Sequence, residues 1–324
     1  MNYRECGVDR GRASLAKRLI KKHAQATFSP SVLSEIGLFG GLFELKSPQV
    51  LVSSTDGVGT KLKIAQFMDK YDTVGIDLVN HCVNDILTLG ASPLFFLDYI
   101  GCGRIYPEHI EEIVQGISHT CQNVGCALIG GELAEMPGTY LDEDFDLVGF
   151  IVGGVEKERI IRGQNIREGD ILLGLPSSGL HTNGYSLVRQ VFGIDDNPQV
   201  LGVYRPELQK TLGEELLIPH ACYYHLLKDA LHLVKGMAHI TGGGMGENVA
   251  RILPPELCTH IEHGSWVPSP IFNLIKREGK LSDEEMERVF NLGIGMVLIS
   301  SPGNTPSLLS QIKKLKVIGE VKRS

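Results

Sequence analysis

The sequence lacks several features that would assign it to a class at once. Its 324 residues include seven cysteines, an odd number with no Cys-x-x-Cys pair. This usage argues against a disulfide framework or a zinc site and indicates reduced thiols in a cytoplasmic protein. Long runs of lysine and arginine are absent, and the formal charge is −7. We therefore expect no nucleic-acid partner, and local groups must hold any anion that binds.

An uninterrupted apolar segment is missing as well. The longest stretches without a charged residue, 113–131 and 171–188, are broken by glycine and by polar residues. We expect neither of them to span a membrane. The first residues contain no apolar segment of the kind found in signal peptides, so we also expect no secretory signal.

Glycine, by contrast, is abundant. The chain has 38 glycines, whereas a typical usage of about 7% would give roughly 23. They show no three-residue period, which excludes collagen, and a hydrophobic fraction of 43% excludes a disordered chain. The length predicts two domains. The charge-rich segment 156–170 is the best candidate linker, and we place the boundary so that the domains cover residues 1–167 and 168–324.

One glycine motif follows a predicted strand. Val50–Ser53 lead into Asp56-Gly57-Val58-Gly59-Thr60-Lys61, which combines a carboxylate, two glycines, a hydroxyl and a lysine at a helix start. Bared amides, a cation and a carboxylate for Mg²⁺ are what phosphate binding requires. The spacing is not that of a Walker A loop. A tight turn whose charges face water explains the motif equally well.

Two further acids, Asp85 and Glu132, lie like Asp56 near the end of a predicted helix or strand and close to glycines. Asp85 lies on the polar side of a predicted helix over 76–89, one turn after His81 and on the same face. Glu132 follows a predicted strand over 127–129 and two glycines. Converging carboxylates near glycine amides suit a Mg²⁺–nucleotide site, so Asp56, Asp85 and Glu132 together predict one. For Asp85 alone, a solvated helix face is the commoner explanation.

The second half carries loops rich in hydrogen-bond donors. Residues 177–184 precede a predicted helix and suit a second phosphate, and His181 among them could act as an acid or base. His239 before the glycines 242–244 is a similar candidate, for which a histidine that caps a glycine turn is the alternative. Asn291 before Gly293 is most simply a turn residue. The apolar glycine segment 37–43 is either a mobile flap or a packed connector, and both interpretations stay open.

The motifs together resemble one family. STDGVGTK, VGIDLVNHCVNDILTLGASPLFFLDYI, GGELAEMPGTY, GLHTNGYSLVR, HITGGG and FNLGIGM occur in the order and spacing of aminoimidazole ribonucleotide synthetase, also called phosphoribosylformylglycinamidine cyclo-ligase. The likeness runs from about Tyr3 to Val321. It implies an α+β protein of two domains: an N-terminal sheet domain that dimerises, and a C-terminal mixed-sheet domain flanked by helices. It also implies a homodimer with ATP and Mg²⁺ bound between domains and across the dimer.

The resemblance assigns roles to individual residues by motif. The implied metal ligands are Asp56, Asp85 and Glu132. The implied ATP contacts are Gly40, Gly41, Leu42, Phe43, Gly57, Gly59, Thr60 and Lys61. The implied catalytic groups are Lys21, Lys61, His181 and His239. The implied substrate contacts are Ser178, His181, Thr182, Asn183 and Asn291.

The implied reaction converts formylglycinamidine ribonucleotide and ATP to aminoimidazole ribonucleotide, ADP and phosphate in purine biosynthesis. ATP phosphorylates the formamide oxygen, the amidine nitrogen attacks the activated carbon, and phosphate leaves. Alignment and charge neutralisation dominate such chemistry. Residues 216–221 depart from the family pattern, which puts fine substrate contacts in doubt.

Two alternatives stay open. One is another phosphotransferase of the same superfamily, such as a selenophosphate synthetase, although Cys6 lacks the context of a catalytic cysteine. The other is a nucleotide-binding subunit without catalysis, against which the retained acids speak.

Overall fold

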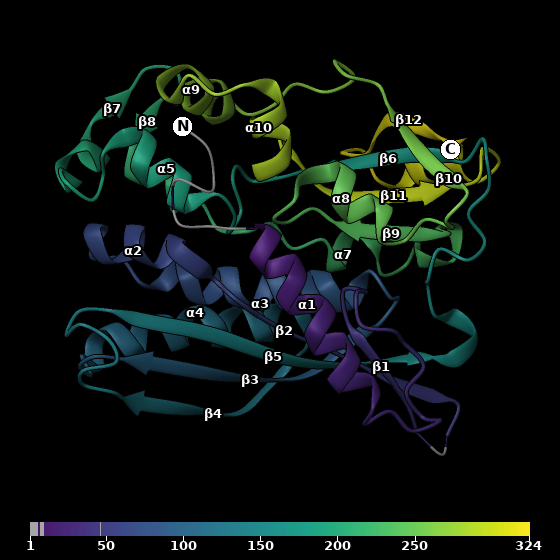
Figure 1. Cartoon of the computed structure of the whole chain (residues 1–324), viewed down its shortest axis with the longest axis horizontal. Coiled ribbons are helices and arrows are strands. Elements are labelled where there is room, and N and C mark those ends of the chain that lie inside the picture. The colour runs from purple at the N-terminus through teal and green to yellow at the C-terminus, as the bar shows by residue number, and fades with distance from the viewer. Residues whose placement is uncertain (1–5, 7–9, 46) are drawn as a thin grey trace.

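The chain folds into two halves, each built on one sheet. A computed structural model describes residues 6, 10–45 and 47–324. The first sheet has the strand order β1-β2-β5-β3-β4 and the second the order β10-β12-β6-β11-β9. Helices accompany both sheets, so the predicted α+β class is confirmed (Figure 1).

The first sheet contains one parallel pair, between β3 and β4, and its other pairs are antiparallel. Its strands are β1 (Gly41–Glu44), β2 (Gln49–Gly57), β3 (Ser92–Cys102), β4 (Ala127–Glu135) and β5 (Phe145–Glu156). The expected strand over 127–129 continues to Glu135, so Gly130, Gly131 and Glu132 lie inside β4 rather than after it.

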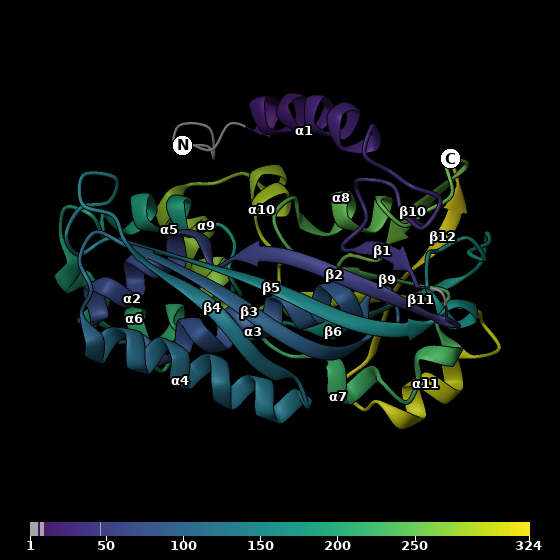
Figure 2. The ribbon, with the colours of Figure 1, turned by 90° about the horizontal axis from the view of Figure 1, so that it is seen from below.

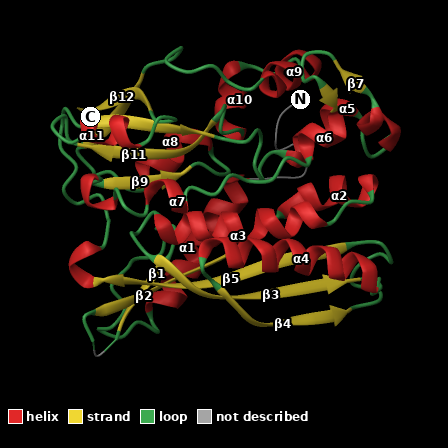
Figure 3. Cartoon of the chain, turned by 180° about the vertical axis from the view of Figure 1, so that it is seen from behind, coloured by secondary structure: helices red, strands yellow, loops and turns green. Residues whose placement is uncertain are grey.

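Helices α3 (Asp72–Leu87) and α4 (Pro107–Val124) cover one face of this sheet (Figures 1 and 3). They cross at Gly75 and Gly116, where an added Cβ would come within 2.1 Å of a backbone carbonyl of the other helix. The expected helix over 76–89 is thus confirmed, and it begins one turn earlier. Along the opposite face, which no helix among the described residues covers, Phe43 and Phe150 are exposed.

The second sheet consists of antiparallel pairs among the described residues. The mixed sheet that was predicted for this half is therefore found in the first half. The strands are β6 (Ile171–Pro176), β9 (Gly236–His239), β10 (Leu257–Ile261), β11 (Ile294–Ser300) and β12 (Lys316–Arg323). β7 (Tyr204–Arg205) and β8 (Lys210–Thr211) form a separate small hairpin. Apolar side chains are buried on both faces of the larger sheet.

The remaining helices are short, except for the first. They are α1 (Arg10–Gln25), α2 (Leu62–Met68), α5 (Tyr185–Phe192), α6 (Leu212–Leu216), α7 (Tyr224–Leu227), α8 (Gly244–Ala250), α9 (Pro270–Gly279), α10 (Asp283–Val289) and α11 (Thr305–Gln311). Figure 2 shows α1 lying outside both sheets, with Leu15, Leu19 and Ile20 exposed. Within the described part of the chain, we find no helix with the length and apolar character needed to cross a bilayer.

Helix α3 joins the two halves. Its side chains Asn80 and Asn84 donate to the carbonyls of His220 and Ala221 at 2.7 and 2.8 Å, and Asn84 Oδ1 accepts from the Tyr223 amide. The side chains of Asn80 and Asn84 are buried, so their pairing fixes how the second half sits on the helix. The polar face of α3 is therefore not solvated but is an inter-domain surface.

Candidate active site between the two halves

The polar end of the domain interface gathers acids and histidines. Asp56 ends β2 on the face that α3 covers, and its Oδ2 lies 2.9 Å from His81 Nε2. Asp85 follows His81 by one turn of α3. Its Oδ2 accepts a hydrogen bond from Ser54 Oγ at 3.0 Å. The structure therefore brings two of the three predicted metal ligands, Asp56 and Asp85, to one helix–strand contact.

The second half completes this cluster. His239, the last residue of β9, places Nδ1 2.9 Å from Asp85 Oδ1. Its Nε2 lies 2.8 Å from Nε2 of His220. Thr182 Oγ1 lies 3.0 Å from His81 Nδ1. Residues from four separate segments thus meet, and the structure brings His239 and Thr182, two of the residues singled out in the sequence, beside the acids.

The charges in the cluster are strongly coupled. Burial alone would raise the pKa of Asp56, but the neighbouring His81, the Gly57 amide and His239 together lower it to about 2. Burial would likewise lower the pKa of His81, but Asp56, Asp85 and Asp77 outweigh burial and raise it to about 9. At neutral pH the metal-free protein therefore holds an imidazolium between carboxylates.

The three histidines that the second half contributes here, His181, His220 and His239, have lowered pKa values. Burial and the nearby positive charges lower the pKa of His181 and His220 well below the usual histidine range, and burial lowers that of His239 in spite of Asp85. His239 Nδ1 then donates to Asp85, and His220 Nε2 donates to His239 Nε2. His181 has φ of +60°, an uncommon conformation outside glycine, and its Nε2 accepts from the Ser178 amide. Its Nδ1 is buried without a partner.

This coupling makes stability depend on pH. Because folding raises the pKa of His81, its contribution is complete below about pH 6.5 and is lost as the pH rises through about 9. The shift corresponds to roughly 3 kcal/mol. In denaturant titrations with a chelator present, we expect the wild type to lose this stability between pH 6 and 10, whereas His81→Gln changes little. Parallel pH profiles for the two proteins would contradict the expectation.

Two residues of the glycine loop after β2, Gly59 and Thr60, are exposed to solvent. Gly59 has φ of +70°, and Thr60 is exposed with Oγ1 3.0 Å from Ser186 Oγ. Gly57 donates its amide to Asp56 Oδ1 at 2.7 Å. Gly59 and Thr60 thus stand beside the acid cluster at the start of a short 3-10 helix (Gly59–Lys61).

Lys61 does not share that exposure. It is fully buried, its Nζ lies 2.7 Å from Asp77 Oδ2, and it donates to Asp77 Oδ1 and to the Ile218 carbonyl. The ammonium group is thus enclosed by one carboxylate and one carbonyl and has no access to solvent. The predicted contact between Lys61 and the triphosphate is therefore wrong for this structure, in which Lys61 ties the first half to the second.

Glu132 is not brought to the other acids. Glu132 on β4 pairs with Tyr99 on β3, Tyr99 pairs with Val148 on β5, and Val148 pairs with Gly57 at the end of β2. Three strand spacings of about 4.8 Å therefore separate Glu132 from the end of β2. Directly paired residues share a face, and Asp56 lies one residue before Gly57, so the two acids point to opposite faces. The expected trio does not form within one chain, because the alternation of the strand directs Glu132 to the uncovered face.

The glycine segment before β2 forms a connector and an edge strand. Gly40 precedes β1, which contains Gly41, Leu42 and Phe43 and pairs with β2. Leu42 is buried and Phe43 is exposed. Arg251 donates to the carbonyls of Gly37 and Leu38. Residues 41–43 therefore belong to an edge strand, and the preceding turn is tied to Arg251 of the second half, whereas a flap over a nucleotide stays a prediction.

Three other predicted residues have structural partners. Lys21 on α1 forms an ion pair with Glu35 at 2.7 Å and contacts none of the cluster. Asn291 accepts from Ser177 Oγ and the Gly293 amide and donates to the Gly179 carbonyl. Ser178 donates to the Pro219 carbonyl. Asn291 is thus a turn residue that holds the 177–184 loop, whereas Asn183 in that loop keeps a buried Nδ2 without a partner.

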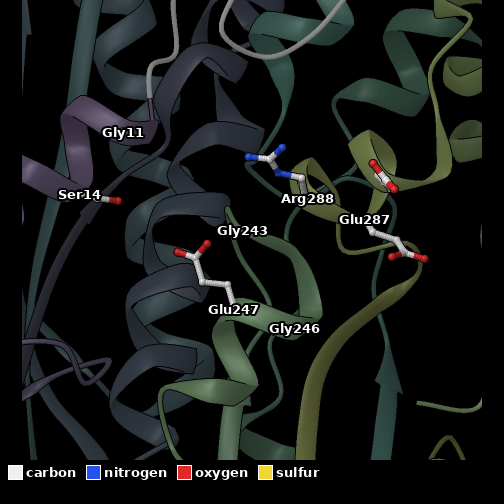
Figure 4. Close-up of a pocket in the computed structure, with 8 residues that line it drawn as sticks. Gly11, Ser14, Gly243, Gly246, Glu247, Glu287 and Arg288 are labelled. Atoms are coloured by element: carbon white, nitrogen blue, oxygen red, sulfur yellow. The ribbon is translucent and has the colours of Figure 1, made fainter. Parts of the chain in front are cut away.

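A separate pocket lies close to His239 along the chain. Four residues after His239, Gly243 lines a cavity of about 630 Å³ between α1, α8 and α10 (Figure 4). Figure 4 shows Ser14 of α1 on one side and Glu247 and Arg288 on the other. The lining has three glutamates and one arginine: Glu247, Glu284, Glu287 and Arg288. Sequence patterns did not reveal this pocket, because three helices distant in the chain form it.

Comparisons with known proteins cover nearly the whole chain. Residues 39–155 match the family model described as "AIR synthase related protein, N-terminal domain", and residues 167–324 match its C-terminal counterpart. The chain is 51% identical over 329 residues to a phosphoribosylformylglycinamidine cyclo-ligase of Geobacillus thermodenitrificans, covering 98% of this chain and 95% of the relative. A cyclo-ligase of Caldicellulosiruptor saccharolyticus is 53% identical over 304 residues, with coverages of 92% and 89%.

Solved structures share the fold. Thiamine monophosphate kinase from Aquifex aeolicus superposes with a TM-score of 0.66 at 16% identity, covering 97% of this chain and 96% of the kinase. PurL of T. maritima complexed with ADP gives a TM-score of 0.58 at 17% identity, covering 90% of this chain and 43% of PurL. The resemblance in the motifs is thus confirmed over full length, and the chain belongs to the phosphoribosylformylglycinamidine cyclo-ligase family of AIR synthase related proteins.

Proposed function

We propose that this chain is an ATP-dependent cyclo-ligase that closes the ring of formylglycinamidine ribonucleotide to give aminoimidazole ribonucleotide, ADP and phosphate. The observation that carries the proposal is the cluster of Asp56, Asp85 and His239 beside the exposed glycine loop. This cluster contains residues of both halves. Relatives that are about 50% identical over most of the chain are named phosphoribosylformylglycinamidine cyclo-ligase. Solved neighbours that bind nucleotides, such as AaThiL complexed with AMPPCP and TMP, support ATP as the phosphate donor.

The proposed roles follow from placement. The Gly59 amide and the Thr60 hydroxyl bind phosphate oxygens of ATP, since both residues are exposed at the start of the 3-10 helix. Asp56 and Asp85 would hold a divalent cation, because both carboxylates lie beside His81, near the end of β2. Such an ion, Mg²⁺ in the simplest case, would neutralise phosphate charge during transfer.

The substrate belongs on the side of the second half. The loop that faces the acid cluster contains Ser178, His181, Thr182 and Asn183. Two of its buried donors, Nδ1 of His181 and Nδ2 of Asn183, have no hydrogen-bond partner, and a polar substrate could accept from them. His239 holds Asp85 in place through its Nδ1. The acidic lining of the pocket in Figure 4 disfavours phosphate, so we place the transferred phosphoryl group at the glycine loop.

The proposed activity is tested by product formation. The protein incubated with formylglycinamidine ribonucleotide, ATP and Mg²⁺ should release one ADP and one phosphate for each molecule of product, detected as a diazotisable amine. Activity with selenide or thiamine phosphate instead would favour another enzyme of the superfamily. ATP binding without any product would favour a catalytically inactive subunit.

We further propose that the chain acts as a cytoplasmic homodimer, divided into domains at 1–167 and 168–324. The face of the first sheet opposite α3 carries Phe150 at 42% exposure and Phe43 at 47%, with Leu94 exposed nearby. Exposed aromatic side chains on a sheet face indicate a protein contact. Two copies packed sheet against sheet would cover them, and Glu132 would then lie in the interface rather than in the site of its own chain.

The dimer makes a testable prediction. Phe150→Asp should convert the protein to a monomer in analytical ultracentrifugation, because a carboxylate would be buried without a partner in the interface. Val317→Asp is the matched control, since Val317 is 42% exposed on β12 of the other half. A dimer that survives Phe150→Asp, or one that only Val317→Asp dissociates, would contradict this placement of the interface.

A further inference from the structure

A cavity of about 900 Å³ lies where the first half connects to the second. Its walls come from Gly90 and Ser92 between α3 and β3, from residues 158–165 between β5 and β6, and from side chains within 228–235 before β9. Figure 1 shows the connection from β5 to β6 at the right-hand edge, where it passes from one half to the other. Cavities of roughly 300–1,000 Å³ are typical of sites for small organic ligands.

The connection that forms one wall is anchored on both sides of Arg162. The buried Ile161 donates its amide to the Leu89 carbonyl at 3.2 Å. Gly163 packs so closely that an added Cβ would come within 2.0 Å of the Ile252 carbonyl. The backbone of Arg162 is therefore held in place before any ligand arrives, which reduces the entropic cost of binding.

Arg162 differs from the other cations of the cavity in having no anion of its own. Arg159 pairs with Glu156 at 2.9 Å, and Lys235 donates to both carboxylate oxygens of Asp170 at 2.7 and 2.8 Å. Arg162 is half-buried, and its guanidinium forms neither an ion pair nor a hydrogen bond with any residue that the structure describes. A guanidinium in a recess is suited to bind a phosphate or carboxylate through two parallel hydrogen bonds.

The cavity has an excess of positive charge in a chain whose formal charge is −7. Its lining has four cations and two acids: Arg159, Arg162, Lys228, Lys235, Glu158 and Asp229. Lys228 also lacks an ion pair within the described part of the chain. Cations that line a concave surface reinforce one another and attract anions. Arg162 and Lys228, on different walls, are therefore the groups available to an anionic ligand.

The rest of the lining suits an organic group rather than a bare ion. Ile160, Leu231 and Val234 contribute apolar surface, and all three are at least half-buried. Gln164 and Asn165 are exposed, and their side-chain amides make no hydrogen bond to described residues. Apolar walls with a few polar groups are typical of sites that bind a ring or a sugar.

We propose that this cavity is a second ligand site, which binds an organic phosphate of the size of a nucleoside monophosphate, with its phosphate on Arg162 and Lys228. The site goes beyond the proposed function, since it shares no residue with the acid cluster or the glycine loop. A ligand held there contacts both halves of the chain and the connection between them.

The test is ligand binding by the full chain, measured by calorimetric titration in the presence of a chelator, so that no cation assists a nucleotide at the acid cluster. The probes are AMP, ribose 5-phosphate, inorganic phosphate and adenosine. We expect AMP to bind most tightly, the two smaller phosphates more weakly, and adenosine not measurably, because it lacks the charged group that Arg162 binds. Adenosine or inorganic phosphate binding as tightly as AMP would overturn the proposal.

Variants locate the bound AMP. Arg162→Gln should raise the Kd for AMP by at least about tenfold, the loss expected for a charge-assisted contact. Its thermal melt should not change, because Arg162 has no partner in the described protein. Arg104→Gln is the matched control, since Arg104 is an exposed arginine outside the lining. An unchanged Kd in Arg162→Gln, or an equal rise in Arg104→Gln, would contradict the assignment.

The glycine loop is the competing location for AMP. Thr60→Val should leave the Kd for AMP unchanged, whereas a loss of binding in Thr60→Val but not in Arg162→Gln would place AMP at the loop and overturn the proposal. A readout on the wild type needs no variant: AMP, but not adenosine, should protect Arg162 from modification by phenylglyoxal, as followed by peptide mass spectrometry. These measurements contain no substrate, so their outcome is independent of the product assay.

Discussion

Asp85→Asn should reduce kcat/KM for ring closure by about a thousandfold while the protein stays folded. Asparagine keeps the size of the side chain. Its single oxygen can still accept from His239 Nδ1, and its NH2 group can donate to Ser54 Oγ, whose proton then goes to the Phe39 carbonyl. The substitution removes the negative charge that would hold a cation against the phosphates. Loss of one electrostatic contribution of this kind typically costs a hundredfold to a thousandfold in rate.

The measurement is steady-state kinetics with ATP and substrate varied separately, together with a thermal melt. Asp196→Asn provides the control, because Asp196 is an exposed carboxylate in the second half, away from the cluster. Full activity in Asp85→Asn would remove Asp85 from the site. A loss of activity that accompanies an equal loss in Asp196→Asn would point to a general effect of charge.

Lys61→Met should destabilise the fold by about 3–5 kcal/mol, because it leaves the buried carboxylate of Asp77 without its cation. Both side chains are completely buried, and their ion pair measures 2.7 Å. Burial lowers the pKa of Lys61 and raises that of Asp77, whereas the ion pair opposes both shifts. The variant also leaves the Ile218 carbonyl without its donor, which weakens the contact between the halves.

Equilibrium denaturation with urea measures this loss. The double variant Lys61→Met with Asp77→Asn should recover most of the stability, because no unpaired buried charge remains and the asparagine oxygen can still accept from the His220 amide. If Lys61→Met were as stable as the wild type but bound ATP poorly, Lys61 would be a phosphate ligand, as its motif first suggested, and not an inter-domain tie.

The comparison between sequence and structure shows which inferences local patterns support. Apolar periodicity placed α3 and α4, and Pro107 and Gly125 marked the ends of α4, with Gly125 at φ of 70°. The helical spacing of His81 and Asp85 correctly put both on one face. These features depend on residues near one another in the chain, which is why the sequence alone suffices for them.

The errors concern partners that are distant in the chain. Lys61 follows two glycines and a threonine, and nothing in that motif reveals that Asp77 and Ile218 enclose it. Glu132 was expected to follow a strand, but β4 continues past it, and the strand alternation turns it to the other face. The role of His220 depends on His239, which lies 19 residues away in sequence and contacts it through folding of the second half.

In the proposed reaction, ATP activates the formyl oxygen of the substrate for ring closure. The most direct measurement uses formylglycinamidine ribonucleotide labelled with ¹⁸O in the formyl group, incubated with the protein, ATP and Mg²⁺. Phosphorylation of that oxygen forms a new P–O bond, and ring closure then breaks the C–O bond. We therefore predict that the released phosphate carries one labelled oxygen for each aminoimidazole ribonucleotide formed. Product formed with the label in water, or no product at all, would contradict the account.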